Sequence, residues 1–419
     1  MAGEAQAHSF GQAYNLPVPF WMYASAAVAT LIFSFLIVGA FLAIPDGKSD
    51  SAHTPKSGRR MARAIPERLV AGLQAVSVLS LLLCIFTGLF GTPSPYGNFN
   101  MTFFWIVFVL GYTYLTALVG DLYALINPWR LLCAWTARAY PAYGRPRWAY
   151  PSWLGYGPAL LLYAALVWIE LFGGISPYSL SLLLFGYTLL NLIAVGLVGA
   201  KAWFAYGEVF AVLLKLIARL APVEFVERAG STLRRVRWRW PGQGLLGRER
   251  EHPTLLLFVL FMLSATAFDG LHETRPWVGL YWTTLYRDVL SHWLGSNPLA
   301  AFPVLRSFYL WWQTAWLLLS PLLYLAAYLL AIELVRRLSG SALRLGALAM
   351  RFTHSLLPIV IVYHVTHYYT LIETQGIKIL ALASDPFGWG WNLFGTADWF
   401  PGQIVPNPAV VWHVQVALI

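Results

Sequence analysis

Long apolar runs, separated by short segments rich in charge, Pro or Gly, dominate the pattern along the chain. A bilayer core takes roughly 20 residues per helix, and helices satisfy their own backbone hydrogen bonds in lipid. Eight runs are long enough to cross: residues 18–45, 69–92, 102–126, 154–174, 179–205, 254–273, 307–335 and 352–383. A ninth begins at 407 and reaches Ile419. The pattern predicts an all-α, polytopic transmembrane helix bundle with eight complete spans and a partial ninth.

Composition supports this prediction. Hydrophobic residues make up 58% of the 419 positions and charged residues only 11%, a balance that excludes an ordinary soluble globular protein. Separate soluble domains are not needed to account for the length, so residues 1–419 are expected to form one integral membrane domain. The two cysteines, Cys84 and Cys133, are too few for a disulfide framework or a thiolate metal site.

The distribution of cations predicts the orientation of the chain. With the N-terminus outside, the loops 46–68, 127–153, 201–252 and 336–351 lie on the cytoplasmic side and carry 24 of the 28 Lys and Arg residues. This asymmetry follows the positive-inside rule. The net charge of +10 therefore reflects topology, and no nucleic-acid partner is expected.

Two segments between spans are distinctive. Residues 206–252 are predicted to form an interfacial, cytoplasmic basic segment, in which the apolar positions of "GEVFAVLLKLIARLAP" suggest an amphipathic helix and "RRVRWRWPGQ" suggests contact with anionic lipid. Residues 385–405 combine Trp and Phe with Gly, Pro and Asp. They are predicted to form an aromatic loop on the outer membrane face.

Ionisable residues inside the predicted spans gather mainly on two of them. Asp269, His272 and Glu273 occupy the end of span 254–273, and His364 and His367 lie on span 352–383. At 100° per residue each set shares one helix face, and Asp269 and His367 lie at the same depth. Because charged groups in a membrane are costly and usually functional, we expect the two faces to meet near the outer surface.

Such a cluster suits a metal held inside a helix bundle. The predicted ligands of a divalent ion are His364, His367, Asp269 and His272. Nitrogen and oxygen ligands fit zinc, iron, manganese or copper without selecting one. A b-type haem, a metal-free catalytic or proton-relay cluster, and simple interhelical hydrogen bonding are the alternatives.

Two further polar residues are predicted at span ends. Asp121 opens "DLYALINPWR", where Pro128 stops the helix and Arg130 can pair with Asp121 or with lipid phosphate. Glu170 lies near the outer end of span 154–174, where it can join the outer site or reach the headgroups.

Five segments resemble a family of bacterial polytopic membrane proteins that includes proteins named fenitrothion hydrolase, which cleave an organophosphorus triester. They are "HSFGQAYNLPVPF" (8–20), "DLYALINPWR" (121–130), "AFDGLHET" (267–274), "YHVTHY" (363–368) and "DPFGWGWNLFGTA" (385–397). The resemblance runs along the whole chain. It departs at Ser9, where Gly is expected, and any ligand on a further helix of the family would lie beyond Ile419.

The resemblance implies a bacterial inner-membrane protein with a periplasm-facing site and hydrolase activity on phosphotriesters. In that interpretation the metal lowers the pKa of bound water and polarises the phosphoryl group, while Asp269 and Glu273 act in catalysis. Two other functions are open: a copper- or zinc-handling or electron-transfer accessory protein, and a structural subunit of a larger membrane complex. Membrane lipid is the expected partner, and partner subunits are the alternative.

Overall fold

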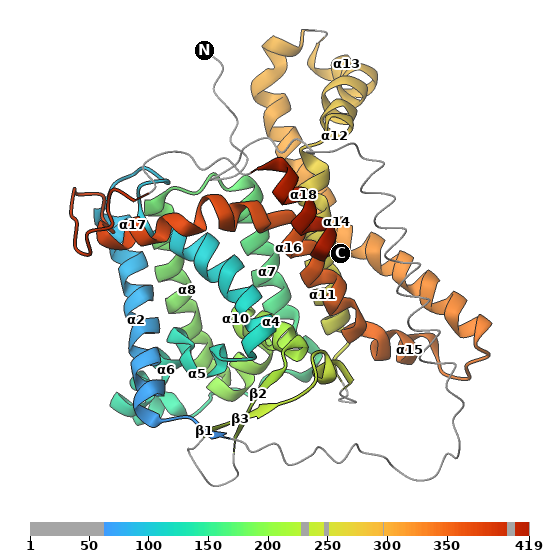
Figure 1. The fold of residues 1–419 in the computed structure, drawn as a ribbon. Coiled ribbons are helices and arrows are strands. Elements are labelled where there is room, and N and C mark those ends of the chain that lie inside the picture. The colour runs from blue at the N-terminus through green and yellow to red at the C-terminus, as the bar shows by residue number, and fades with distance from the viewer. Residues whose placement is uncertain (1–62, 228–233, 247–250, 296, 400–406, 419) are drawn as a thin grey trace.

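The computed structural model describes residues 63–227, 234–246, 251–295, 297–399 and 407–418 (Figure 1). Its membrane-length helices are α2 (Glu67–Phe90), the continuous stretch Phe99–Val119 made of α3, η1 and α4, α8 (Pro177–Val198), α11 (Thr254–His272), α14 (Pro298–Leu338), and the stretch Leu345–Thr374 made of α15, η8 and α16. These six are long and apolar enough to cross a membrane. The chain is therefore a helical, multi-pass membrane protein.

Shorter elements complete the fold. The stretch Phe99–Val119 divides into α3 (Phe99–Met101), η1 (Thr102–Tyr112) and α4 (Thr113–Val119), and the last long stretch divides into α15 (Leu345–Phe352), η8 (Thr353–Leu356) and α16 (Leu357–Thr374). The others are β1 (Arg63–Ala64), α5 (Tyr123–Ile126), α6 (Pro128–Ala139), η2 (Pro141–Gly144), η3 (Ser152–Leu154), α7 (Gly157–Phe172), α9 (Ala200–Ala202), η4 (Trp203–Gly207), α10 (Val209–Ile217), η5 (Ala218–Leu220), β2 (Val223–Glu227), β3 (Arg234–Trp238), η6 (Gln243–Leu246), α12 (Arg275–Gly279), η7 (Leu280–Leu290), α13 (Ser291–Leu294), η9 (Gly376–Lys378), α17 (Ile379–Ser384) and α18 (Pro408–Leu418).

Most predicted spans correspond to helices at nearly the same positions. The predicted run 154–174 is the 16-residue helix α7, which is apolar but shorter than the six. The run 307–335 is only the middle of α14, whose helix continues for 41 residues. The run 352–383 ends early, because α16 stops at Thr374 and separate short helices follow. The run 18–45 lies outside the described residues.

Large apolar side chains cover much of the outside of the bundle. Leu161 is 72% exposed and Leu330 is 73% exposed. In water such a surface would be an aggregation liability. Contact with lipid accounts for it, since a membrane helix need not hide leucine from its solvent.

The segment after α8 differs from its predicted form. Every residue of α10 except Lys215 is buried, and α10 contacts α4, α5 and α7. It is therefore a short helix inside the bundle and does not lie on the surface. Its high apolar content suits this position better than one amphipathic face would.

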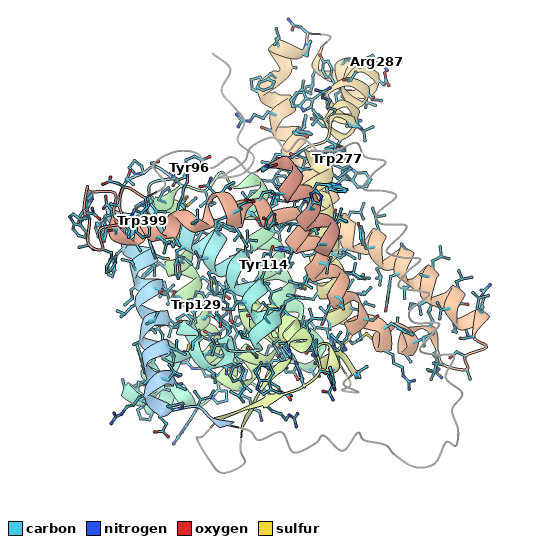
Figure 2. The ribbon with its side chains drawn as sticks, viewed as in Figure 1. Tyr96, Tyr114, Trp129, Trp277, Arg287 and Trp399 are labelled. Carbon is cyan, nitrogen blue, oxygen red and sulfur yellow. The ribbon has the colours of Figure 1, made fainter. Side chains whose placement is uncertain are left out.

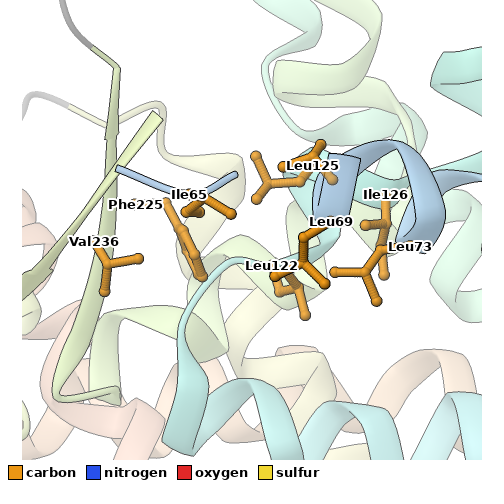
Figure 3. A pocket seen from close by; sticks show the side chains of 9 residues that line it. Ile65, Leu69, Leu73, Leu122, Leu125, Ile126, Phe225 and Val236 are labelled. Atoms are coloured by element: carbon orange, nitrogen blue, oxygen red, sulfur yellow. The ribbon is translucent and has the colours of Figure 1, made fainter. Parts of the chain in front are cut away.

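The basic segment also contains strands that the apolar pattern did not predict. β2 and β3 form an antiparallel hairpin, and β3 pairs on its other side with β1, with Arg63 opposite Val236. Gly120, at φ +85°, ends α4 beside this sheet, and a Cβ there would lie 2.4 Å from the Val223 carbonyl oxygen. An apolar cavity of about 240 Å³ lies between the sheet and α2 (Figure 3).

At the opposite end of the bundle, η7 and α13 fold back against the start of α14 to form a projection (Figure 1). The aromatic loop begins after α17. Asp385 accepts hydrogen bonds from the backbone of Trp389 and Gly390, and the Phe387 carbonyl accepts one from Thr92. The loop thus closes over the end of α2. Its residues 400–405 lie outside the described part of the chain.

Candidate functional site

Helix α11 carries the first half of the site and lies at the centre of the bundle. It packs against α7, α14 and α16, and most of its residues are buried. The helix is apolar on all sides, as a helix surrounded by others should be. Small residues allow close approach to α14, where Ser320 donates a hydrogen bond of 2.9 Å to Ser264. The last turn of α11 then holds Asp269 rigidly.

Asp269 joins α11 to α16. One carboxylate oxygen, Oδ2, lies 2.8 Å from His367 Nε2 and accepts a hydrogen bond of 2.6 Å from the Tyr368 hydroxyl. The Asp269 side chain is only 4% exposed, whereas that of His367 is 27% exposed. The predicted meeting of the two helix faces is therefore present, with His367 between the buried carboxylate and more open space.

His272 and Glu273 lie at the C-terminal end of α11, one turn after Asp269. His272 Nδ1 donates to the backbone carbonyl of Asp269 at 2.7 Å, and this nitrogen lies 3.8 Å from the Asp269 carboxylate. Its ring stacks on Phe268. Glu273 caps the C-terminus of α11 with an exposed side chain. The structure thus holds His272 against its own helix and turns Glu273 outward.

His364 contacts a third helix. The Tyr114 hydroxyl, on α4, lies 2.9 Å from His364 Nδ1 and 3.2 Å from the His364 carbonyl oxygen. Figure 2 shows Tyr114 within the bundle. The His364 ring also lies beside Tyr368, with 4.7 Å between ring centroids. Glu170 on α7 is close enough to Tyr114 and Tyr368 to interact with both electrostatically.

Each of these donors has contacts within the protein. Among the residues that the structure describes, no three His, Cys, Asp or Glu side chains lie close enough together to hold a metal. Asp269 Oδ2 is engaged by His367 and Tyr368, while His364 faces Tyr114. The arrangement is two hydrogen-bonded groups, Asp269 with His367 and Tyr368, and His364 with Tyr114, which meet where the His364 and Tyr368 rings contact. The divalent ion, and with it the haem alternative, stays a prediction from the sequence.

A second buried carboxylate lies at the start of α10. Glu208 is fully buried and accepts hydrogen bonds from Tyr187, from Asn127, and from the backbone N–H groups of Phe210 and Ala211. It caps the N-terminus of α10, where a carboxylate is favoured by the exposed N–H groups. Burial raises the pKa of the Glu208 carboxyl, and these four donors oppose that rise.

Sequence reasoning missed three of these residues. Tyr368 could have been found, because it follows His367 and lies four residues after His364 on the same helix. Tyr114 carries no local signal, since its partner is on a distant helix. Glu208 falls in a segment predicted to lie on the membrane surface, where a carboxylate needs no explanation.

Comparison with protein-family models, with curated proteins and with solved structures finds no match to this chain.

Proposed function

We propose that the chain is a bacterial inner-membrane protein with its N-terminus outside, eight complete spans and a partial ninth. The positions of the cations support this topology. It places the β-sheet on the cytoplasmic side, and the ends of α11 and α16 toward the periplasm. Asp269 and His367 then lie in the outer half of the membrane.

We further propose that Asp269 and His367 form an acid–base pair that activates water. The observation that carries this proposal is the contact of 2.8 Å between His367 Nε2 and Asp269 Oδ2. Because a carboxylate only accepts, Nε2 carries the hydrogen, and the lone pair of the ring is left on Nδ1. Asp269 fixes this tautomer and stabilises the cation that forms when Nδ1 takes a proton.

The substrate class proposed is a neutral, lipophilic phosphotriester, as the resemblance implies. Water would attack phosphorus as His367 Nδ1 removes its proton, and the bond to the aryloxide would break. The proton then passes from the imidazolium to the aryloxide, so the products are a phosphodiester and a phenol. An apolar triester partitions into the membrane, which favours a site reached from the lipid.

The test is hydrolysis of a dialkyl nitrophenyl phosphate by the purified full chain in vesicles. Release of nitrophenolate is followed by its absorbance. Since general-base catalysis contributes roughly 100- to 10,000-fold, His367→Ala should lower the rate by at least about 100-fold.

His292 offers a matched control. It is an exposed histidine on α13, away from Asp269, and His292→Ala should keep the wild-type rate. An inactive wild-type protein, or equal losses in both variants, would refute the hydrolase proposal.

A further inference from the structure

A second pocket, which contains several charged residues, lies away from the acid–base pair. It has a volume of about 380 Å³ and is lined by residues from α5, α6, α9, η4 and α10. This volume is at the lower end of that found for small-molecule sites. Asp121 and Lys201 line it, and each closely follows the end of a membrane-length helix. The pocket therefore opens at the level where lipid headgroups lie.

Three cations converge on this pocket. Arg130, Lys201 and Lys215 line it, against one carboxylate, that of Asp121. Neither lysine forms a salt bridge with any residue that the structure describes, and both side chains are exposed. Lys215 is the only residue of α10 that is not buried. A negatively charged ligand would pair with these cations.

The walls of the pocket position Arg130. Its guanidinium lies over the Phe204 ring, 4.9 Å from the centroid, and donates to the Ala124 carbonyl at 3.4 Å. Asp121 is turned back on its own loop, where it accepts a hydrogen bond from the Ala124 N–H. The positive charge at this site thus exceeds the negative charge.

A buried hydroxyl adds a second observation. Tyr123 lines the pocket and is 2% exposed, and its hydroxyl has no hydrogen-bond partner among the described residues. A buried polar atom without a partner is costly and calls for an explanation.

We propose that this pocket binds the headgroup of an anionic phospholipid, with the phosphate held by Arg130, Lys201 and Lys215. The apolar surface beside the pocket suits the acyl chains: α5 also borders the separate apolar cavity of Figure 3 through Leu125 and Ile126. The inference is independent of the acid–base pair. It assigns a lipid site to the cytoplasmic side of the membrane, whereas Asp269 and His367 are proposed to lie in the outer half.

The experiment measures lipid retention by the full chain. Protein reconstituted in vesicles of mixed phosphatidylglycerol and phosphatidylcholine is released into detergent and weighed intact by mass spectrometry. The wild type should retain phosphatidylglycerol in preference to phosphatidylcholine. Lys201→Ala/Lys215→Ala should weaken this binding about 25-fold, because each cation near an anionic headgroup contributes roughly a fivefold factor.

A matched double variant provides the control. Arg138 and Arg145 are exposed arginines near the same membrane face that do not line the pocket. Arg138→Ala/Arg145→Ala removes the same charge and should retain the lipid as the wild type does. Equal losses in the two double variants would overturn the proposal, because the effect would then follow net charge alone.

Two further measurements keep the result decisive. Lys201→Gln/Lys215→Gln repeats the loss of charge with longer side chains, and circular dichroism shows that each variant is folded. Free glycerol phosphate is then added to lipid-loaded wild type. Failure to displace phosphatidylglycerol supports a lipid site, whereas displacement at equal affinity would assign the pocket to a soluble phosphate compound and overturn the proposal.

Discussion

Two carboxylates, Asp269 and Glu208, are buried in the part of the chain that the structure describes, and their surroundings differ in a consistent way. Glu208 is 0% exposed, and its two oxygens accept from four donors, two of which are backbone N–H groups of the helix it caps. Asp269 is nearly as buried. The side chains of His367 and Tyr368 hydrogen-bond to it, and the His367 ring is partly exposed.

This difference distinguishes a carboxylate with a structural role, Glu208, from a candidate catalytic carboxylate, Asp269. A carboxylate surrounded by fixed donors stabilises a fold and has little left to offer a substrate. A carboxylate that orients a histidine ring, with the second ring nitrogen facing away from it, can support proton transfer at that nitrogen. We therefore expect loss of Glu208 to be seen in stability and loss of Asp269 in activity.

The largest effect expected is on stability. Glu208→Ala leaves Tyr187, Asn127 and two backbone N–H groups without their acceptor, which should lower the free energy of unfolding by roughly 3–5 kcal/mol. Denaturant unfolding in detergent measures it. Glu224, in the exposed pair with Arg237, is the control, and Glu224→Ala should cost less than about 1 kcal/mol. If Glu208→Ala and Glu224→Ala lower the free energy of unfolding by similar amounts, Glu208 does not have the structural role assigned to it.

The next effect is on rate. Asp269→Asn keeps the shape of the side chain but no longer fixes the Nε2–H tautomer of His367 or stabilises its cation, so triester hydrolysis should fall by about 100-fold. The unfolding midpoint should move less than it does in Glu208→Ala. A variant that unfolds readily yet hydrolyses normally would reverse the roles assigned to the two carboxylates.

A smaller effect is expected at Tyr368. Tyr368→Phe removes one of the two hydrogen bonds to Asp269 Oδ2 and leaves the ring in place, so the rate should fall by roughly fivefold to tenfold, corresponding to about 1–1.5 kcal/mol. Tyr369→Phe changes the neighbouring tyrosine of the same helix and serves as the control. An unchanged rate in Tyr368→Phe would limit the reacting unit to the pair of Asp269 and His367.

The smallest effect is expected from metal removal. Dialysis against a chelator should leave hydrolysis unchanged, since the acid–base pair acts through its own groups. Elemental analysis before and after dialysis is the measurement. Loss of activity on dialysis, restored by zinc, copper, iron or manganese, would instead support the ligand set predicted from the sequence and would contradict water activation by His367 and Asp269 alone.

Helix positions were predictable wherever apolar runs were bounded by charge or Gly and Pro. The run 254–273 differs from α11 by one residue at its end. The predicted boundaries were wrong at two places. Asn297 caps α14 well before the predicted start of that span. The apolar residues of α17 follow the polar residues 373–376 so closely that the predicted span continued past the end of α16.

Part of the candidate site was also predictable, from the spacing of residues along the helices. Helical spacing and depth placed Asp269 opposite His367, because both depend only on distance along a helix. The Tyr114 contact depends on how η1 and α4 lie against α16, which periodicity cannot supply. The sequence did not predict the burial of α10, because a helix with many apolar residues has the same hydrophobic pattern whether it contacts lipid or is surrounded by protein.

The pairing of β1 with β3 has a consequence for how the protein is made. β1 is synthesised before α2, α7 and α8, and its partner β3 only after them. The three-stranded sheet can therefore form only after α2, α7 and α8 have been synthesised. Protection of the Val236 backbone amide from hydrogen exchange would report that the first half of the bundle has been inserted and assembled.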